Sequence, residues 1–245
     1  MAASGCHCFN EPLHQVRLDQ CKRLYQNKQF RLALEQLEGL QEQYPSINPY
    51  EIALLMGKCR VAMGAKMHIL TLNYLKKSQK STKKQIKAAS FAELGQLYYM
   101  IYDYGKAIDY FVKALDMPVD LPEIESIYCH LAIAYQSKGQ WREADKYFTK
   151  CFESPDLKWE KTAKSRFGCK AFVIQLTTFD NAQQAREFVS KIQGNNIPVT
   201  ILPIQNNTNI KYSINLYRMN DYKTAQEALK TLLKQYPEAI ILPVP

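Results

Sequence analysis

One arrangement of residues returns four times along the chain and constrains its fold more than any other feature. In each copy a polar residue precedes an aromatic one, an alanine lies three positions after the aromatic, and a bulky apolar residue follows four positions later. The copies are QFRLALEQL from Gln29, DYGKAIDYF from Asp103, QWREADKYF from Gln140 and DYKTAQEAL from Asp221. These offsets suit the start and one face of a helix, with the alanine allowing a second helix to approach closely.

A shorter pattern lies upstream of each copy and predicts that second helix. There a small residue precedes a larger apolar one by three positions, in the pairs Cys21/Leu24, Gly95/Tyr98, Ala132/Tyr135 and Ser213/Leu216. Downstream of each copy a proline ends the helix, at Pro45, Pro118, Pro155 and Pro237, because the residue before a proline is disfavoured in the helical conformation. The sequence therefore predicts a series of antiparallel helix pairs.

This pattern resembles the tetratricopeptide repeat (TPR) family, whose thirty-four-residue unit is one such pair. The best match consists of Phe91, Leu94, Gly95, Tyr98, Tyr104, Ala107, Phe111 and Ala114. Two degenerate pairs are predicted from about 50 to 79, around Gly64, and from about 159 to 192, with Asp180 as the N-cap and Gln183 at capping-box spacing.

The resemblance implies an all-α fold: a right-handed α-solenoid of about six antiparallel helix pairs. Residues 1–12 are expected to be a flexible N-terminal segment and residues 13–193 to form pairs one to five. Pro198 and Pro203 exclude a continuous helix, so residues 194–205 are predicted as an extended linker. Residues 206–245 would form the sixth pair and a C-terminal tail.

The family's first helices line a concave groove, and the resemblance implies that partners bind there. The matching small and apolar positions of this sequence are Ala92, Cys129, Ile133 and Ile214. The polar and aromatic ones, predicted as contact residues, are Lys22, Tyr25, Lys58, Gln96, Tyr99, Gln136, Asn207 and Tyr217. Tyrosines and amides suit an extended or helical peptide, because they offer contact area and can satisfy its backbone.

A basic segment, LKKSQKSTKKQIK, lies between the second and third predicted pairs. Its lysines are Lys76, Lys77, Lys80, Lys83, Lys84 and Lys87, with no acidic residue among them. Lysines in the first turn of a helix oppose its dipole, so the local structure does not explain them. A solvated inter-repeat loop, a docking patch for an acidic segment or phosphate, and a nuclear-import signal all stay open.

Catalytic and metal-binding motifs are missing from the sequence, so we predict no enzyme activity, no cofactor and no metal. The cluster Cys6-His7-Cys8 does not fit the usual zinc spacing. Seven cysteines, several within apolar helical patterns, indicate a reducing compartment, hence the cytoplasm, with a nuclear location as the alternative. No apolar run is long enough to span a bilayer.

The sequence thus predicts a protein-interaction scaffold or adaptor, a subunit of a larger assembly. With a net charge of +9, its partners would be proteins with acidic or amphipathic segments. Exposed Ile240, Ile241 and Leu242 at the end of the last pair would favour self-association or capping by a partner. The alternative function is binding of RNA or another nucleic acid.

Overall fold

The computed structural model describes residues 13–45, 47–64, 69–192, 198–206 and 209–245. The chain divides into two compact units, Met1–Pro122 and Glu123–Pro245. Residues 1–12, with Cys6, His7 and Cys8, lie outside the described residues, as does Asn207. No helix among the described residues is both long and apolar enough to cross a membrane.

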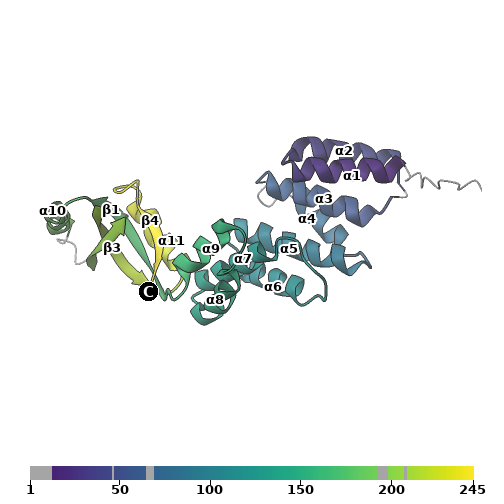
Figure 1. Cartoon of the computed structure of the whole chain (residues 1–245). Helices are drawn as coiled ribbons and strands as arrows, with labels where there is room; N and C mark the ends of the chain where they lie inside the picture. Colours follow the sequence, from purple (N-terminus) through teal and green to yellow (C-terminus); the bar gives the residue numbers. More distant parts are fainter. Residues whose placement is uncertain (1–12, 46, 65–68, 193–197, 207–208) are drawn as a thin grey trace, which may run out of the picture. The chain divides into compact units, whose positions relative to one another are not determined.

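Three helix pairs make up the described part of the first unit (Figure 1). Their members pack mainly on each other, as α1 on α2, α3 on α4 and α5 on α6. The bounds are α1 Leu13–Gln26, α2 Phe30–Gln43, α3 Pro49–Ala62, α4 Ile69–Ser78, α5 Lys84–Met100 and α6 Tyr104–Leu115. The degenerate second pair is confirmed, and Gly64, which follows α3, has a φ of +76° that favours glycine.

The repeated arrangement acts as expected, because each copy begins a helix at its aromatic residue. The helices α2 and α6 start at Phe30 and Tyr104, and the alanines three positions later are fully buried. Asp103 caps α6 by accepting a hydrogen bond from the backbone N–H of Lys106. In the α5–α6 pair, Gly95 lies directly against the buried ring of Phe111.

The second unit begins with one more helix pair and then changes architecture. Helix α7 (Ile124–Ser137) packs on α8 (Trp141–Phe148), which continues as the 3-10 turn η1 (Thr149–Cys151). Helix α9 (Leu157–Arg166) follows and also contacts α7. The side chain of Gln136 donates to the carbonyl of Arg166 at 3.1 Å and accepts from the same residue's guanidinium at 2.9 Å, which fixes the end of α9.

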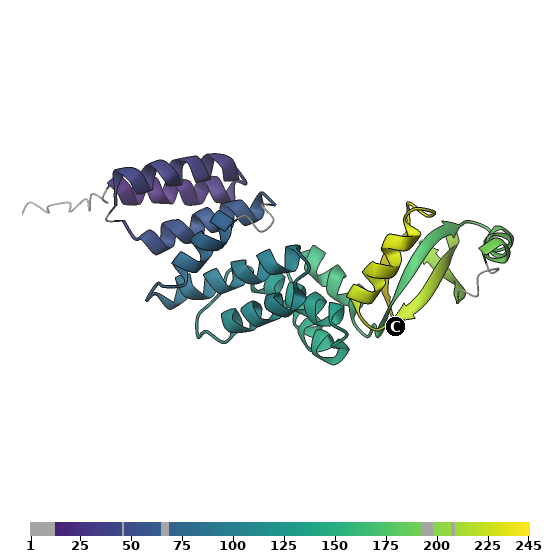
Figure 2. The ribbon, with the colours of Figure 1, turned by 180° about the vertical axis from the view of Figure 1, so that it is seen from behind.

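The remainder of the unit is a four-stranded antiparallel sheet with two helices, in the order strand, helix, strand, strand, helix, strand. The elements are β1 Ala171–Phe179, α10 Ala182–Ile192, β2 Val199–Asn206, β3 Asn209–Met219, α11 Tyr222–Leu232 and β4 Ile240–Val244. The strand order is β2-β3-β1-β4, with both α10 and α11 packed against β1 and β3. Figure 2 shows α11 lying along the strands.

The prediction of an all-α fold is therefore wrong from residue 171 onward. The predicted pair at 159–192 is α9, a strand and α10, and the described part of the predicted linker contains β2. Asn181, not Asp180, caps α10, accepting from the N–H of Gln183 at 2.7 Å. The predicted sixth pair consists of β3, α11 and β4.

A period-two alternation was the sequence signal that this prediction overlooked. Ile210, Tyr212, Ile214 and Leu216 alternate with more polar residues, a pattern typical of a strand with one buried face. The pair Ser213/Leu216 matched the helical offset by coincidence. In a helix this spacing places two residues on one side, whereas in a strand it places them on opposite faces.

The sheet packs on the preceding helix pair through an aromatic contact. The ring of Trp141, at the start of α8, lies 5.1 Å from that of Phe172 on β1, which is itself 5.6 Å from the ring of Tyr222. Beside it, a Cβ on Gly139 would lie only 2.8 Å from the carbonyl oxygen of Asn220.

Candidate functional site

Two surfaces are candidates for binding. We call the exposed side of α1, α3 and α5 the first-helix face, and the side of the sheet away from α10 and α11 the open sheet face. Each is described within its own unit.

The lysines predicted to line the groove are engaged in ion pairs on the first-helix face. Lys22 on α1 lies 2.9 Å from Glu51 on α3 and 3.0 Å from Asp19. Burial by itself would lower the pKa of Lys22, but hydrogen bonds to Glu51 and Asp19 raise it above its ordinary value. Its charge is therefore balanced within the protein, which leaves the predicted attraction for acidic segments at this position without support.

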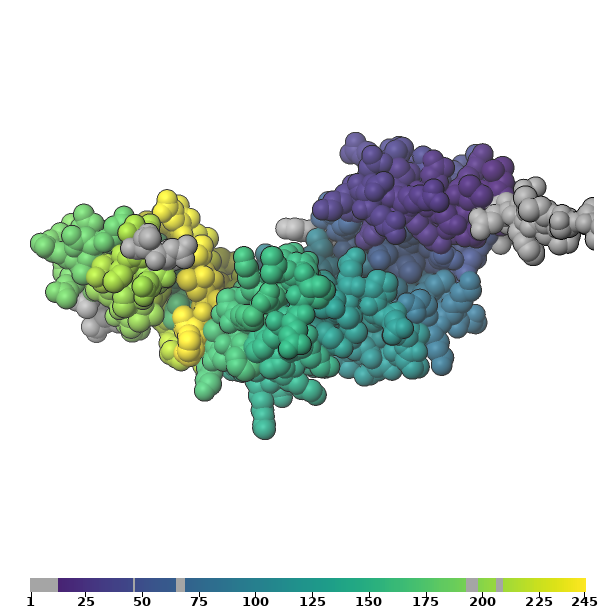
Figure 3. Space-filling model, viewed as in Figure 1, coloured from purple at the N-terminus to yellow at the C-terminus, as the bar shows by residue number. Residues whose placement is uncertain are grey.

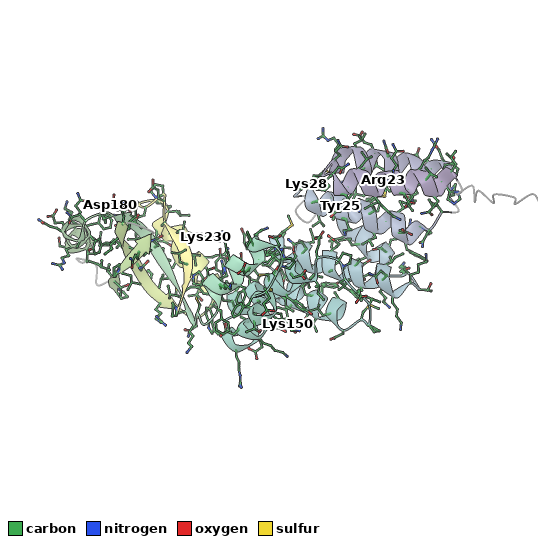
Figure 4. The ribbon with its side chains drawn as sticks, viewed as in Figure 1. Arg23, Tyr25, Lys28, Lys150, Asp180 and Lys230 are labelled. Atoms are coloured by element: carbon green, nitrogen blue, oxygen red, sulfur yellow. The ribbon has the colours of Figure 1, made fainter. Side chains whose placement is uncertain are left out.

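A second set of contacts links α1, α3 and α5. The ammonium of Lys58 lies 3.6 Å from the carboxylate of Glu93 on α5 and 5.2 Å from the ring centroid of Tyr25 on α1. Figure 4 shows Tyr25 near the C-terminal end of α1. Gln96 lies three residues after Glu93, and Tyr99 lies six residues after Glu93, so both continue the same side of α5. Both are half-buried.

The other predicted groove residues do not join this face. Gln136 is fully buried and binds the end of α9. Tyr217 lies on β3, with a φ of +54°, and packs in the core of the sheet. Gln136 does lie on a first helix, but the end of α9 covers it, whereas Tyr217 was assigned to a helix where the chain forms β3.

Tyrosine rings stack on one another within two of the helix pairs. The ring of Tyr98 is parallel to that of Tyr110 at 5.4 Å, and Tyr135 to Tyr147 at 5.7 Å in the second unit. Lysines lie over these stacks, such as Lys150 at 5.3 Å from the Tyr147 centroid (labelled in Figure 4). These rings hold each helix pair together.

The open sheet face carries a row of polar side chains that crosses the sheet. The row runs through Thr200 on β2, Asn215 on β3 and Gln175 on β1, which are paired in this order, and ends at the apolar Ile240 on β4. The amide nitrogen of Gln175 donates to the hydroxyl of Ser213 at 2.6 Å, and that hydroxyl donates to Asn215 at 2.9 Å. Both Ser213 and Asn215 are buried, so this network is rigid and presents Gln175 and Thr200 outward.

Apolar side chains flank this polar row. Leu202 pairs with Ser213 and is 44% exposed, and Ile240 pairs with Gln175 and is 48% exposed. The opposite face of the sheet contributes Phe172, Ile174 and Leu216 to the core beneath the helices. Sequence analysis missed this surface because it treated these segments as helix and linker.

Burial shifts the pKa of several titratable groups in the described part of the chain. Burial, together with the charge of Lys158, lowers the pKa of His130 to about 4, so this imidazole is neutral. Burial raises the pKa of the Cys59 thiol to about 12. The five described cysteines are free and buried, and no group of three or more metal-ligating side chains is found among the described residues.

The basic segment spans the end of α4, a short turn and the start of α5, and it does not form a long loop. Lys76 and Lys77 end α4, and α5 begins at Lys84 after a short turn. A hydrogen bond between the buried hydroxyls of Ser78 and Ser90, which are 2.6 Å apart, links the two helices beside the turn.

Models of two protein families match parts of the second unit. Residues 125–155, which span α7, α8 and η1, match the tetratricopeptide repeat, and residues 170–243 match the SPOR domain. A solved structure of MamA (AMB-1, form C2221) is 19% identical, with a TM-score of 0.43 over 56% of this chain and 76% of that one. No curated protein matches the chain. The match of residues 125–155 confirms the resemblance to the TPR family, and TPR and SPOR domains are typically binding modules.

Proposed function

We propose that the chain is a non-catalytic scaffold that attaches to peptidoglycan through the open sheet face and holds a polypeptide segment on the first-helix face. The TPR match supports a protein-interaction scaffold in general, and the SPOR match points toward peptidoglycan. The observation that carries the proposal is the open sheet face, since the SPOR match spans nearly all of β1 to β4.

The chemistry of this face suits a glycan strand. Sugar rings present hydroxyl groups, which donate and accept hydrogen bonds, around less polar ring faces. Amide and hydroxyl side chains such as Gln175 and Thr200 can do both, while Leu202 and Ile240 offer apolar contact. Binding to a rigid network costs little side-chain entropy, because Ser213 and Asn215 are already fixed.

The first-helix face suits a polypeptide of mixed charge. Its described ion pairs alternate in sign, from Lys22 and Glu51 to Lys58 and Glu93. The acidic and basic groups of such a segment could form ion pairs with the side chains of these partly exposed pairs. The side-chain amide of Gln96 could form hydrogen bonds with the backbone of the segment. The partner is thus proposed to carry charges of both signs, whereas the net charge predicted partners with acidic or amphipathic segments.

A sedimentation assay with purified peptidoglycan sacculi tests the wall-binding part. Leu202→Glu and Ile240→Glu each place a carboxylate beside the polar row. A bound glycan would bury this charge without a partner, which is unfavourable, so we expect at least about a tenfold weaker association. Leu233→Glu is the matched control, since Leu233 is a 39% exposed leucine just after α11. Equal sedimentation of all three variants and the unmodified chain would exclude this face.

Photo-crosslinking in cells tests the polypeptide part. With a photoreactive phenylalanine analogue at Tyr99, we expect a crosslinked protein that is absent when the analogue replaces Tyr102. Tyr102 is 56% exposed, more than the half-buried Tyr99, so exposure alone would give the opposite result. Crosslinks at Tyr102 only would contradict binding on the first-helix face.

The proposal and the predicted cytoplasmic location compete, because peptidoglycan lies outside the cytoplasm. Cell fractionation decides between them. Recovery of the chain entirely with the cytoplasm would leave the protein-binding part of the proposal and remove the wall-binding part.

A further inference from the structure

The first unit contains a long stretch of one charge sign. Between Glu51 and Glu93 there is no acidic residue, whereas Lys58, Arg60, Lys66 and the six lysines of the basic segment all fall there. We call Lys76, Lys77, Lys80, Lys83, Lys84 and Lys87 the basic corner. Such a stretch concentrates positive potential on α4 and the start of α5.

The corner is held in place by buried hydrogen bonds. The hydroxyl of Ser78 donates to the carbonyl of Leu75 at 2.8 Å, and that of Ser90 donates to the carbonyl of Ile86 at 2.7 Å. Both serines are fully buried and contact each other. The lysines therefore project from a fixed turn, so their clustering is a property of the folded state.

The charge of the corner is not balanced within the described residues. None of its six lysines takes part in an ion pair there, whereas Lys22, Lys58, Lys106, Lys164 and Lys211 do. Lys84 and Lys87 also lie in the first turn of α5, where the helix dipole repels cations. The cluster therefore lowers stability, and a negatively charged partner outside the chain would compensate it.

Exposed aliphatic side chains adjoin the corner on α4. Ile69 is 69% exposed and Leu70 is 43% exposed. Ile69, Asn73 and Lys76 are exposed and recur with helical spacing. One side of α4 thus passes from apolar at its start to basic at its end.

The chemistry of the cluster distinguishes between anionic partners. All six residues are lysines, which act as mobile point charges and lack the bidentate geometry with which arginine recognises single phosphates or carboxylates. Tyr74, the aromatic residue of α4, is half-buried and packs against the α1–α3 core, so it offers no stacking surface for bases. Lysine clusters beside exposed aliphatic residues are typical of surfaces attracted to anionic bilayers.

We propose that the basic corner, together with Ile69 and Leu70, binds the surface of a membrane that contains anionic lipid. The lysines would lie at the level of the headgroups, with the two aliphatic side chains entering the interface. This is attachment to one surface of the bilayer. It does not depend on the open sheet face, so the wall-binding proposal and this one can fail separately.

Vesicle flotation with the full chain tests the proposal. The probes are vesicles of phosphatidylcholine alone and of phosphatidylcholine with phosphatidylglycerol. We expect binding only to the anionic vesicles, with loss on adding salt. Lys80→Glu/Lys83→Glu/Lys84→Glu should weaken binding at least about a hundredfold, from the known contribution of each lysine near an anionic surface.

The matched control reverses the same number of charges in the other unit. Lys223, Lys230 and Lys234 are exposed, on α11 and just after it (Lys230 is labelled in Figure 4). Their triple glutamate variant should retain most of the binding. Because Lys80, Lys83 and Lys84 are also exposed, both variants should keep the unmodified helical content, which circular dichroism checks.

A second variant separates the aliphatic contribution. Ile69→Ser/Leu70→Ser should weaken vesicle binding several-fold without changing its salt dependence. Equal binding of the corner variant and the unmodified chain would overturn the proposal. So would equal binding to neutral vesicles, or binding to polyglutamate or RNA in the absence of any binding to anionic vesicles.

Discussion

Replacing Gly95 by leucine is expected to destabilise the first unit severely. A Cβ at this position would lie 2.5 Å from Cδ1 and 2.7 Å from Cε1 of Phe111, far inside van der Waals contact. The Phe111 ring is 1% exposed and cannot move aside without disturbing α5 and α6. Overpacking of this kind costs about 1–3 kcal/mol, occasionally more, and we expect a loss near or above the upper value because the clash involves the first side-chain atom.

Denaturant unfolding followed by circular dichroism measures this loss, and Gly39 provides a control. Gly39 is also helical, on α2, but a Cβ there would meet nothing within 4 Å. It borders an open cleft of about 300 Å³ between α1 and α2, in the part of the first unit drawn in purple in Figure 3. Gly39→Leu should leave stability unchanged or raise it by up to about 1 kcal/mol through helix propensity. Similar unfolding of both variants would contradict the close helix approach at Gly95.

Replacing Phe172 by alanine is expected to have the largest effect on the second unit. The side chain is 1% exposed, belongs to the core of the sheet and contacts the rings of Trp141 and Tyr222. Removing a buried phenylalanine costs about 3–5 kcal/mol. The loss should also loosen the packing of the sheet on α8, because the ring contacts Trp141 at the start of that helix.

Fluorescence of Trp141 reports on that loosening. The chain has two tryptophans, so Trp159→Phe leaves Trp141 as the single emitter, and we expect a red shift when Phe172 is removed. Phe179→Ala is the control: this ring lies at the other end of β1, is half-buried, and contacts Phe188. It should cost less stability and leave the emission unchanged. An unshifted Trp141 spectrum in Phe172→Ala would show that the ring does not hold the junction.

Membrane attachment and wall binding, if both hold, concern separate units of one chain. The basic corner lies in the first unit and the open sheet face in the second. Lys80→Glu/Lys83→Glu/Lys84→Glu should then weaken only vesicle binding and Ile240→Glu only sacculus binding, and the combined variant should show both losses, each as large as in the single variant, since sites that share no contacts behave independently.

The sequence by itself determined where the helices of the repeats begin and which side chains hold them together. Phe30, Tyr104, Trp141 and Tyr222 each begin a helix, and the alanines three positions later are fully buried. These features were predictable because capping and contacts at three- and four-residue spacing are local. The pattern could therefore be recognised even at Tyr222, where the neighbouring element is a strand.

Only the tertiary structure decided what each of those helices packs against and which polar side chains are available to bind a partner. The strands β1 and β4 lie at opposite ends of the sheet domain's sequence, yet they pair, and such a pairing depends on hydrogen bonds between distant residues that no local spacing records. For the same reason Lys22 and Lys58 were predicted as contact residues for a bound peptide, although Glu51 and Glu93 on neighbouring helices pair with them. Gln136 likewise became structural because α9 supplies a backbone carbonyl beside it. Local interactions fix the elements, but the partner of each exposed group depends on contacts that exist only once the chain has folded.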